Sequence, residues 1–260
     1  TDWLAFQERS NKPELLSPGR VILRFDGLDT TKLKRFDQRI DLAAGAVKIE
    51  METPEGTIRV EVAGDMRRKT LVVTCLDDRP EAGPTTVTYY NWRGAKPPVE
   101  HYQTALAAKD GLLTGRQHVN VKINRRPAKG DPREVDDPVY GLAYGVAIGL
   151  RDVDGGLSAE AATKTIDPRH VSLTLPKDGR GYFELGIASV SVNDASDPVA
   201  PAVDRLKATL GESYENRLKA RRAWWREFWS TSWIDIQGPD AEYLARLWYV
   251  TLYNYACVGD

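Results

Sequence analysis

The side chains best suited to chemistry in this sequence are carboxylates that stand beside one another or beside a histidine. They are Asp77 with Asp78, Asp136 with Asp137, and Glu100 with His101. Two carboxyl groups can cleave a glycosidic bond when they lie about 5 to 9.5 Å apart across a bound sugar, but adjacency in sequence does not set that distance. We interpret Asp136 and Asp137 as part of a solvated, Pro-flanked turn. Asp78 is expected to pair with Arg79 or to end a strand.

Other signals for catalysis, cofactor binding or metal binding are weak. His101, His118 and His170 are scattered singly and are interpreted as ordinary surface or hydrogen-bonded residues. The sequence contains no Gly-rich phosphate loop after a strand, no HExxH and no GxSxG. Without a CxxC pair, Cys75 and Cys257 are expected to be buried, unpaired thiols. We therefore assign no catalytic, cofactor-binding or metal-binding residue to this chain.

Aromatic residues are concentrated in residues 221–238, where four of the seven tryptophans fall within ten positions. On a helix Trp225 and Trp229 share a face, while Trp224 points roughly 100° away. Each ring buries about 150 to 250 Å², so the helix is expected to contact partners on two sides. The predicted domain-interface cluster is Trp224, Trp225, Phe228, Trp229, Trp233 and Trp248. A sugar-stacking platform is the alternative, and Trp92 is a second candidate for that role or a core residue.

The elements that must position these residues are mostly short strands. Patterns of period two, or continuous β-branched runs, predict strands at Val21–Phe25, Val47–Thr53, Thr57–Asp65, Thr70–Asp78, Thr85–Arg93, Tyr140–Leu150, His170–Pro176 and Gly181–Val192. Gly45 and the Pro54–Gly56 stretch supply turn residues between strands. Residues 125–138 are predicted to form a long polar surface loop. This spacing favours an antiparallel β-sandwich over alternating strands and helices.

The pattern changes to helical after Val192. Ser196 and Asp197 are candidate N-caps, with Pro198 at the first helical position. Apolar residues then recur mostly every four positions at Leu206, Leu210, Tyr214, Leu218, Trp225 and Trp229, and Gly211 is a possible break between two helices. A further helix, capped by Asp240, is apolar nearly all round, which is typical of a helix buried on every side.

Composition limits the partners of this chain of 260 residues. It has 36 basic and 37 acidic residues, a net charge of -1, without a basic stripe that could follow a phosphate backbone. We therefore expect no nucleic-acid partner. Because no run reaches the roughly 18 to 20 apolar residues needed to cross a bilayer, we also expect no membrane span. The predicted organisation is a β-sandwich domain at 1–195, a helical linker at 196–237 and the start of a further helical domain at 238–260.

The pattern W-W-x-x-F-W-x-x-S-W-I, from Trp224 to Ile234, resembles the junction found in glycoside hydrolases of family 95 and their bacterial relatives. Residues 240–257 continue the likeness, and Leu15–Phe25 and Phe36–Glu50 add weaker matches to strands of those proteins. The resemblance implies an N-terminal antiparallel β-supersandwich, linker helices and the first helix of an (α/α)6 barrel. The sequence departs from the family in two places. Fucosidases of the family tend to have a histidine just before the paired tryptophans, where this chain has Arg221 and Arg222, and residues 124–141 match no pattern of the family.

The same resemblance implies a function for a longer protein. That protein would be an inverting glycoside hydrolase, α-L-fucosidase-like, acting on polysaccharide or glycan side chains, with its catalytic residues on barrel loops beyond Asp260. It would be secreted or periplasmic. The chain, which begins at Thr1 and ends inside a predicted helix, is expected to be an inactive piece whose last helix packs on a missing barrel. Two alternatives remain: a non-catalytic carbohydrate-binding or structural β-sandwich, and a glycoside phosphorylase of related architecture.

Overall fold

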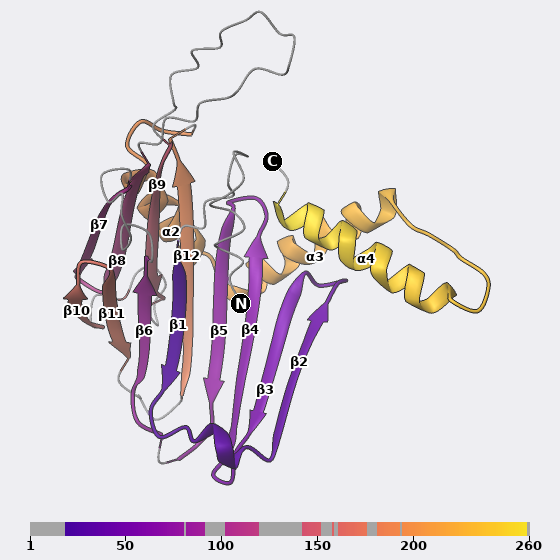
Figure 1. The fold of residues 1–260 in the computed structure, drawn as a ribbon, viewed down its shortest axis with the longest axis horizontal. Coiled ribbons are helices and arrows are strands. Elements are labelled where there is room, and N and C mark those ends of the chain that lie inside the picture. Colours follow the sequence, from indigo (N-terminus) through magenta and orange to yellow (C-terminus); the bar gives the residue numbers. More distant parts are fainter. Residues whose placement is uncertain are drawn as a thin grey trace, which may run out of the picture.

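The computed structural model describes residues 19–80, 82–91, 102–119, 142–151, 158, 161–175, 181–192 and 194–258. Two antiparallel β-sheets of unequal width pack face to face within these ranges (Figure 1). The smaller sheet, in spatial order, contains β1 (Arg20–Phe25), β6 (Thr85–Tyr90), β11 (His170–Leu175) and β10 (Ala162–Asp167). The larger sheet contains β2 (Arg35–Asp41), β3 (Ala46–Glu52), β4 (Thr57–Asp65), β5 (Thr70–Asp77), β12 (Tyr182–Ser191), β9 (Leu142–Leu150), β8 (Leu112–Val119) and β7 (Tyr102–Lys109).

The main core lies between the two sheets. Side chains at alternate positions point inward, as the period-two pattern requires, and Ile58, Leu113, Ile148, Leu173 and Leu185 are all fully buried there. Cys75 also lies in this core, where burial raises the pKa of its thiol to about 12. The sandwich therefore has its own apolar core.

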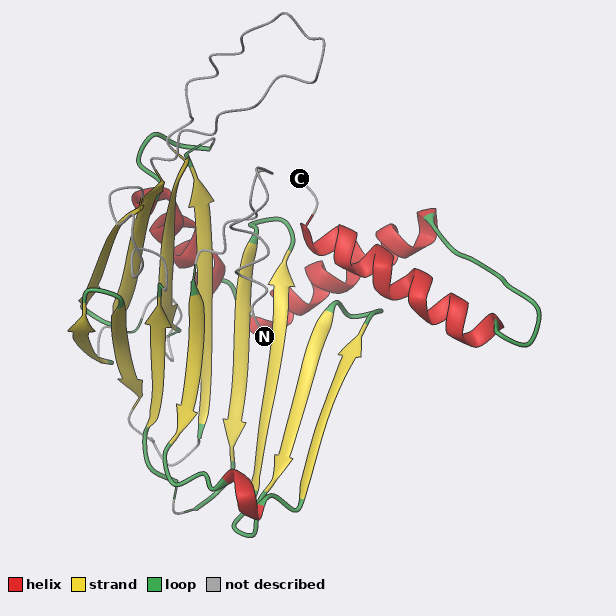
Figure 2. Cartoon of the chain, in the orientation of Figure 1, coloured by secondary structure: helices red, strands yellow, loops and turns green. Residues whose placement is uncertain are grey.

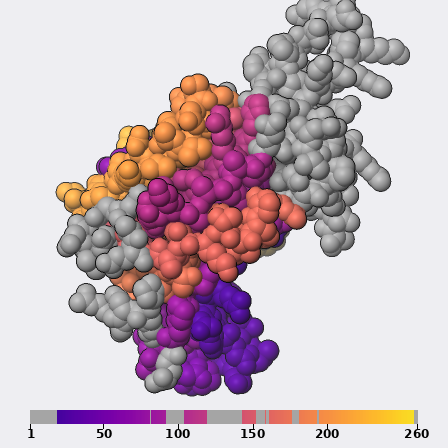
Figure 3. Space-filling view, turned by 90° about the vertical axis from the view of Figure 1, so that its left-hand side faces the viewer, coloured from indigo at the N-terminus to yellow at the C-terminus, as the bar shows by residue number. Residues whose placement is uncertain are grey.

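Helices follow the last strand and lie outside the sandwich (Figure 2). They are α2 (Val199–Gly211), α3 (Tyr214–Thr231) and α4 (Ala241–Val258), and a short 3₁₀ helix, η1 (Thr30–Lys32), stands between β1 and β2. The helix α2 covers the outer face of β9 and β12, and Figure 3 shows this segment in orange above the magenta strands of the β7–β8 edge. The helices α3 and α4 extend from the other end of the larger sheet as a hairpin (Figure 1).

A smooth sheet surface allows α2 to lie close to the strands. Ala202, Leu206 and Leu210 on the helix are completely buried. A Cβ at Gly186 of β12 would stand 2.5 Å from a methyl of Leu206, closer than real atoms approach. Glycine at this strand position is therefore required by the helix above it.

The fold class predicted from the sequence is confirmed: the chain is mainly an antiparallel β-sandwich followed by helices at the C-terminus. The break at Gly211 is also confirmed, since α2 ends there. Four strands were missed by the pattern analysis. The strand β2 was suggested only by the family resemblance at Phe36–Glu50, β7 is rich in alanine, β8 contains Gly115, and β10 is a short polar edge strand. Gly115 is required because a Cβ there would stand 2.5 Å from the ring of Tyr89.

Several local predictions need correction. Pro198 occupies the N-cap position instead of the first helical position, and the Asp197 carboxylate accepts a hydrogen bond from the Val199 amide at 3.3 Å. Asp78 does not pair with Arg79; the buried partner of Arg79 is Asp77, at 2.7 Å, and Asp78 accepts from the backbone of Thr57. Successive side chains of a strand point to opposite faces of the sheet, and of the two adjacent carboxylates Asp77 is the one that points into the sandwich, where Arg79 meets it.

The two cysteines also differ from each other. Cys75 is buried as predicted, but Cys257 is exposed, because the C-terminal part of α4 has no cover on that side among the described residues. Across the same residues, no helix has the length and apolar character that crossing a bilayer requires.

Candidate functional site

The predicted aromatic cluster lies where α3, α4 and the β2–β3 turn meet. Trp225 is its centre, with 1 % of its surface exposed. Its ring stacks on Tyr253 of α4 at 5.1 Å between centroids and on Trp229 at 5.7 Å, and it meets Trp224 and Phe228 edge to face. These offset and edge-on geometries are the favourable ones for aromatic pairs.

The β2–β3 turn receives the cluster on the sheet side. A Cβ at Gly45 would stand 1.6 Å from Nε1 of Trp225, and Gly45 has a φ of 59°, in the left-handed region that glycine adopts without strain. One turn further along α3, Nε1 of Trp229 donates to the carbonyl oxygen of Leu42 at 2.9 Å. The turn chemistry that the sequence suggested at Gly45 therefore also makes room for the tryptophan.

The remaining members of the predicted cluster are placed differently. Phe228 stacks on Trp224 at 5.4 Å, and Trp248 of α4 meets its neighbour Tyr249 edge to face at 5.0 Å. Tyr249 in turn contacts Trp229 at 5.6 Å. Trp233 is 73 % exposed and takes part in no aromatic contact among the described residues. Five of the six predicted residues thus share one continuous chain of ring contacts, and Trp233 stands apart from it.

A group of charged side chains, which sequence reasoning did not find, holds the other end of α3. The Arg217 guanidinium pairs with the Glu184 carboxylate of β12, and both side chains are buried. Arg217 also donates to the carbonyl oxygen of Thr209 at 3.2 Å. Arg151 of the neighbouring strand donates to the carbonyl oxygen of Leu210 at 2.9 Å. A buried guanidinium with several acceptors is the arrangement in which an ion pair can offset its own desolvation.

The β4–β5 turn extends this charged group on the α2–α3 corner. Arg68 pairs with Asp65 at 2.7 Å and with Glu212 at 2.6 Å, and the hydrogen bond that Arg68 donates to Asp65 raises the pKa of Arg68. Arg221, one turn beyond Arg217, pairs with Glu61 of β4 at 2.8 Å. We call this group, Asp65, Arg68, Glu184, Glu212, Arg217 and Arg221, the charged clamp. No sequence motif could reveal it, because its members come from β4, the β4–β5 turn, β12, the α2–α3 connection and α3.

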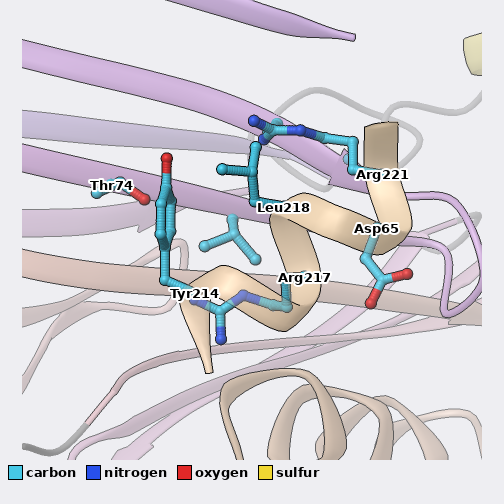
Figure 4. A pocket seen from close by; sticks show the side chains of 9 residues that line it. Asp65, Thr74, Tyr214, Arg217, Leu218 and Arg221 are labelled. Carbon is cyan, nitrogen blue, oxygen red and sulfur yellow. The ribbon is translucent and has the colours of Figure 1, made fainter. Parts of the chain in front are cut away.

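A small pocket lies beneath α3, between the charged clamp and the sheet (Figure 4). Its walls include Thr74, Tyr214, Arg217, Leu218 and Arg221, and Figure 4 shows that the last four of these side chains come from the α3 helix. Its volume is about 20 Å³, which is enough for one water molecule and far too small for a sugar ring. The pocket is therefore part of the packing between helix and sheet.

The isolated titratable residues form no reaction centre among the described ranges. His170 stacks on Tyr90 at 4.3 Å and pairs with Asp167 at 2.8 Å. The pKa of Asp167 is lowered first by the hydrogen bond from the Arg169 amide and then by His170. His118 lies on β8 and has no described acidic partner. His101, Glu100, Trp92 and the Asp136–Asp137 pair lie outside the described residues. Within the described part, no group of three or more His, Cys, Asp or Glu side chains could hold a metal ion.

The junction is thus a packing site: aromatic rings fix one end of α3, charged groups fix the other, and the pocket beneath the helix is too small for a sugar. Comparison by sequence adds nothing, since no protein-family model and no curated protein matches this chain.

Comparison by structure finds the same fold within longer chains. A protein from the human microbiome, assigned as a kojibiose phosphorylase, aligns with a TM-score of 0.50 and 10 % identity over 81 % of this chain and 27 % of its own. A bacterial glucoamylase solved with acarbose gives a TM-score of 0.47 at 11 % identity, covering 80 % of this chain and 31 % of its own. A family 92 glycosyl hydrolase gives 0.47 at 15 %, covering 80 % and 27 %.

At such low identity the first alignment shows a shared fold and nothing more, and the two scores below 0.5 are too low to add to it. The chain spans about a quarter to a third of the length of these proteins.

Proposed function

We propose that this chain is the N-terminal, non-catalytic part of a carbohydrate-active enzyme. The observation that carries the proposal is the alignment of 81 % of this chain with 27 % of a much longer protein assigned as a kojibiose phosphorylase. In this reading the sandwich supports a catalytic domain, and the aromatic cluster and charged clamp hold α3 and α4 as the rigid connection between the two.

The exposed apolar surface of α4 is consistent with a second, helical domain that packs against this helix. Tyr243, Leu247 and Val250 recur at steps of four and three on one face and are 68 %, 51 % and 38 % exposed. Such a stripe fits the surface of another helix. On a neighbouring face of α4, Tyr249 and Tyr253 already contact the tryptophans of α3. We propose that the outer stripe packs against an (α/α)6 barrel of which α4 is the first helix.

The reaction proposed for the whole protein is inverting hydrolysis of a glycosidic bond, with an α-L-fucosidase-like specificity for polysaccharide or glycan side chains. This finer assignment is supported by the W-W-x-x-F-W-x-x-S-W-I pattern, of which Trp225 and Trp229 occupy the centre of the observed cluster. The proposed location of such a protein is outside the cytoplasm, secreted or periplasmic.

The test is an assay of the full-length protein that contains this chain, on a panel of fucosylated and other glycans, with and without inorganic phosphate. Release of free sugar without phosphate supports the hydrolase, and a product that forms only with phosphate assigns a phosphorylase. If no glycan is cleaved under either condition, while the full-length protein is folded, the proposal is wrong and the sandwich is a binding or structural module. The chain of 260 residues is the matched control and is expected to be inactive.

A further inference from the structure

The strand β2 forms one edge of the larger sheet and is paired on one side only. The spatial order of that sheet begins with β2, and no other described strand pairs with its outer edge. Figure 1 shows β2 at the right-hand margin of the sheet, below the hairpin of α3 and α4. An unpaired edge presents a row of backbone donors and acceptors that another strand can use.

The inner face of β2 carries apolar side chains that remain uncovered. Phe36 and Ile40 stand opposite Met51 and Val47 of β3, and they are 57 % and 47 % exposed. Gln38 lies between them on the same face, because side chains at every second position of a strand share a face. Met51 belongs to the main core. The apolar inner surface of the sandwich therefore extends to the edge of the sheet.

The outer face of β2 carries charges that alternate in sign, at Arg35, Asp37, Arg39 and Asp41. On the β3 side these charges are poorly matched, since Asp37 stands directly opposite Glu50. Arg39 likewise stands opposite Lys48, and its side chain is 66 % exposed. Like charges directly opposite each other on neighbouring strands are destabilising. The alternation is therefore not explained by the pairing of β2 with β3.

A second copy of β2 supplies the missing match. When two copies run antiparallel with the two Gln38 residues opposite each other, all seven residues of the strand are paired. The opposite positions are then Arg35 with Asp41, Phe36 with Ile40, and Asp37 with Arg39. Every outer-face pair joins opposite charges, and each inner-face pair of Phe36 and Ile40 joins an aromatic to a β-branched side chain, both of which are favourable. A register centred on Asp37 or on Arg39 would instead place like charges opposite each other, so the charges select one register.

We propose that two copies of this chain associate through β2, so that the larger sheet continues across a two-fold axis at Gln38. The interface is isologous, since each copy contributes the same strand, and it closes with two copies. It buries Phe36 and Ile40 of both copies and pairs the outer backbone groups of β2. The proposal does not depend on the function proposed above, because α4 takes no part in it.

Two charge-reversal variants test the interface. Arg39→Asp places carboxylates opposite each other across the two-fold axis, and Asp37→Arg places guanidinium groups there. Each variant alone should associate at least about tenfold more weakly than the parent, measured by sedimentation equilibrium up to about 100 µM. An equal mixture of the two variants restores opposite charges, so heterodimers should form with nearly the parental affinity. A monomeric parent, or a mixture that associates no better than the variants alone, would overturn the proposal.

These variants are not expected to weaken the fold itself. Within one copy, Arg39→Asp places a carboxylate opposite Lys48, and Asp37→Arg places a guanidinium opposite Glu50, so both changes replace like charges by opposite ones. The Tm of each variant should stay within about 2 °C of the parent under conditions where all are monomeric. Leu247→Lys on the exposed face of α4 is the control for association through that helix and should leave the dimer unchanged. If Leu247→Lys abolished association while Arg39→Asp did not, the proposal would be wrong.

A disulfide across the two-fold axis tests the register. Directly opposite residues of an antiparallel pair have Cα atoms about 4.5 to 5.5 Å apart, which a disulfide can bridge. Gln38→Cys, made together with Cys257→Ser to remove the exposed native thiol, should therefore give a covalent dimer on mild oxidation. Ile166→Cys, on the exposed edge strand β10 of the smaller sheet, is the matched control and should remain monomeric. Equal crosslinking at both positions, or none at position 38, would overturn the proposal.

Discussion

Helix α4 is richer in apolar residues than helix α2, and yet its side chains are the more exposed of the two. The inner residues of α2, Leu206 and Leu210, are fully buried on a sheet surface made smooth by glycine and alanine. On α4, Leu247 and Tyr255 are 51 % and 71 % exposed. The apolar character of a helix therefore shows that it needs a partner, but not whether the described part of the chain supplies one.

Two regions of the helical segment are held by different interactions. Close packing and the charged clamp fix α2 and the start of α3, whereas ring contacts beside the β2–β3 turn hold α4 and the end of α3. We expect changes near α2 to unfold the sandwich and changes on α4 to leave it intact. The following predictions test this difference, from the largest expected effect to the smallest.

Thiol labelling gives the largest contrast. Cys75 is fully buried with its pKa raised to about 12, whereas Cys257 is exposed. Cys75 reacts only when the sandwich unfolds, so at neutral pH we expect it to be labelled at least about a thousandfold more slowly than Cys257. The rates are measured with single variants Cys75→Ser and Cys257→Ser. Comparable rates would mean that the sandwich opens as readily as the end of α4.

The sign of the pH effect at Cys75 follows from its raised pKa. The contribution of the buried, neutral thiol is complete below the pKa of an unfolded thiol, about 8.5. As pH rises from there toward 12 that contribution falls, so labelling of Cys75 should accelerate steeply in this range.

Arg217→Ala removes the centre of the charged clamp and leaves Glu184 buried without its partner. Breaking such a pair costs about 3 to 5 kcal/mol in the free energy of unfolding, measured by denaturant titration. The control is Arg246→Ala in the exposed Arg246–Glu242 pair of α4, which should cost less than about 1 kcal/mol. If Arg217→Ala had an effect as small as the control, the clamp would not hold α3.

Leu206→Ala and Leu247→Ala compare the same chemical change on the two helices. We expect about 2 to 5 kcal/mol of lost stability at Leu206, where a cavity forms, and within about 0.5 kcal/mol of no change at Leu247. Equal losses would mean that α4 is as tightly packed as α2.

Gly45→Ala tests the contact between the hairpin turn and Trp225. The new methyl would overlap Nε1 of Trp225, and the residue would keep a positive φ, so we expect a loss of about 1 to 3 kcal/mol together with a changed tryptophan fluorescence. Gly211→Ala is the matched control, because a Cβ there meets nothing within 4 Å. An unchanged emission spectrum in Gly45→Ala would contradict the observed packing of the ring.

Asp41→Asn should have the smallest effect. The hydrogen bond from Lys48, with that from the Ala44 amide, lowers the pKa of Asp41 at the start of the β2–β3 turn. The Asp41 carboxylate is partly exposed and its partner Lys48 more so, so the contribution of the pair is small and screened by salt. Because the pKa of Asp41 is lower in the folded chain than in the unfolded chain, its stabilising contribution is complete above the unfolded pKa, near pH 4. The contribution is lost as the carboxylate becomes protonated in acid. The Tm difference between Asp41→Asn and the parent should therefore be present at pH 7 and absent at pH 2.

The sequence was sufficient for what local patterns decide. Alternating runs such as Thr57–Asp65 predicted strands, and Gly211 marked the boundary between two helices. The spacing of Trp225 and Trp229 placed both rings on one face of α3, because helical periodicity alone determines this. The antiparallel sandwich followed from the same short-range signals.

Only the tertiary structure decided which residues from distant segments meet. Glu184 and Arg217 stand 33 positions apart, and Gly45 lies 180 positions from the tryptophan it accommodates. Trp233 has the same residue type as Trp225 and yet is exposed, since its position after the end of α3 points it away from the other rings. Periodicity assigns a side chain to a face, but which surface covers that face depends on how the sheets and helices pack, and that information is not local in the sequence.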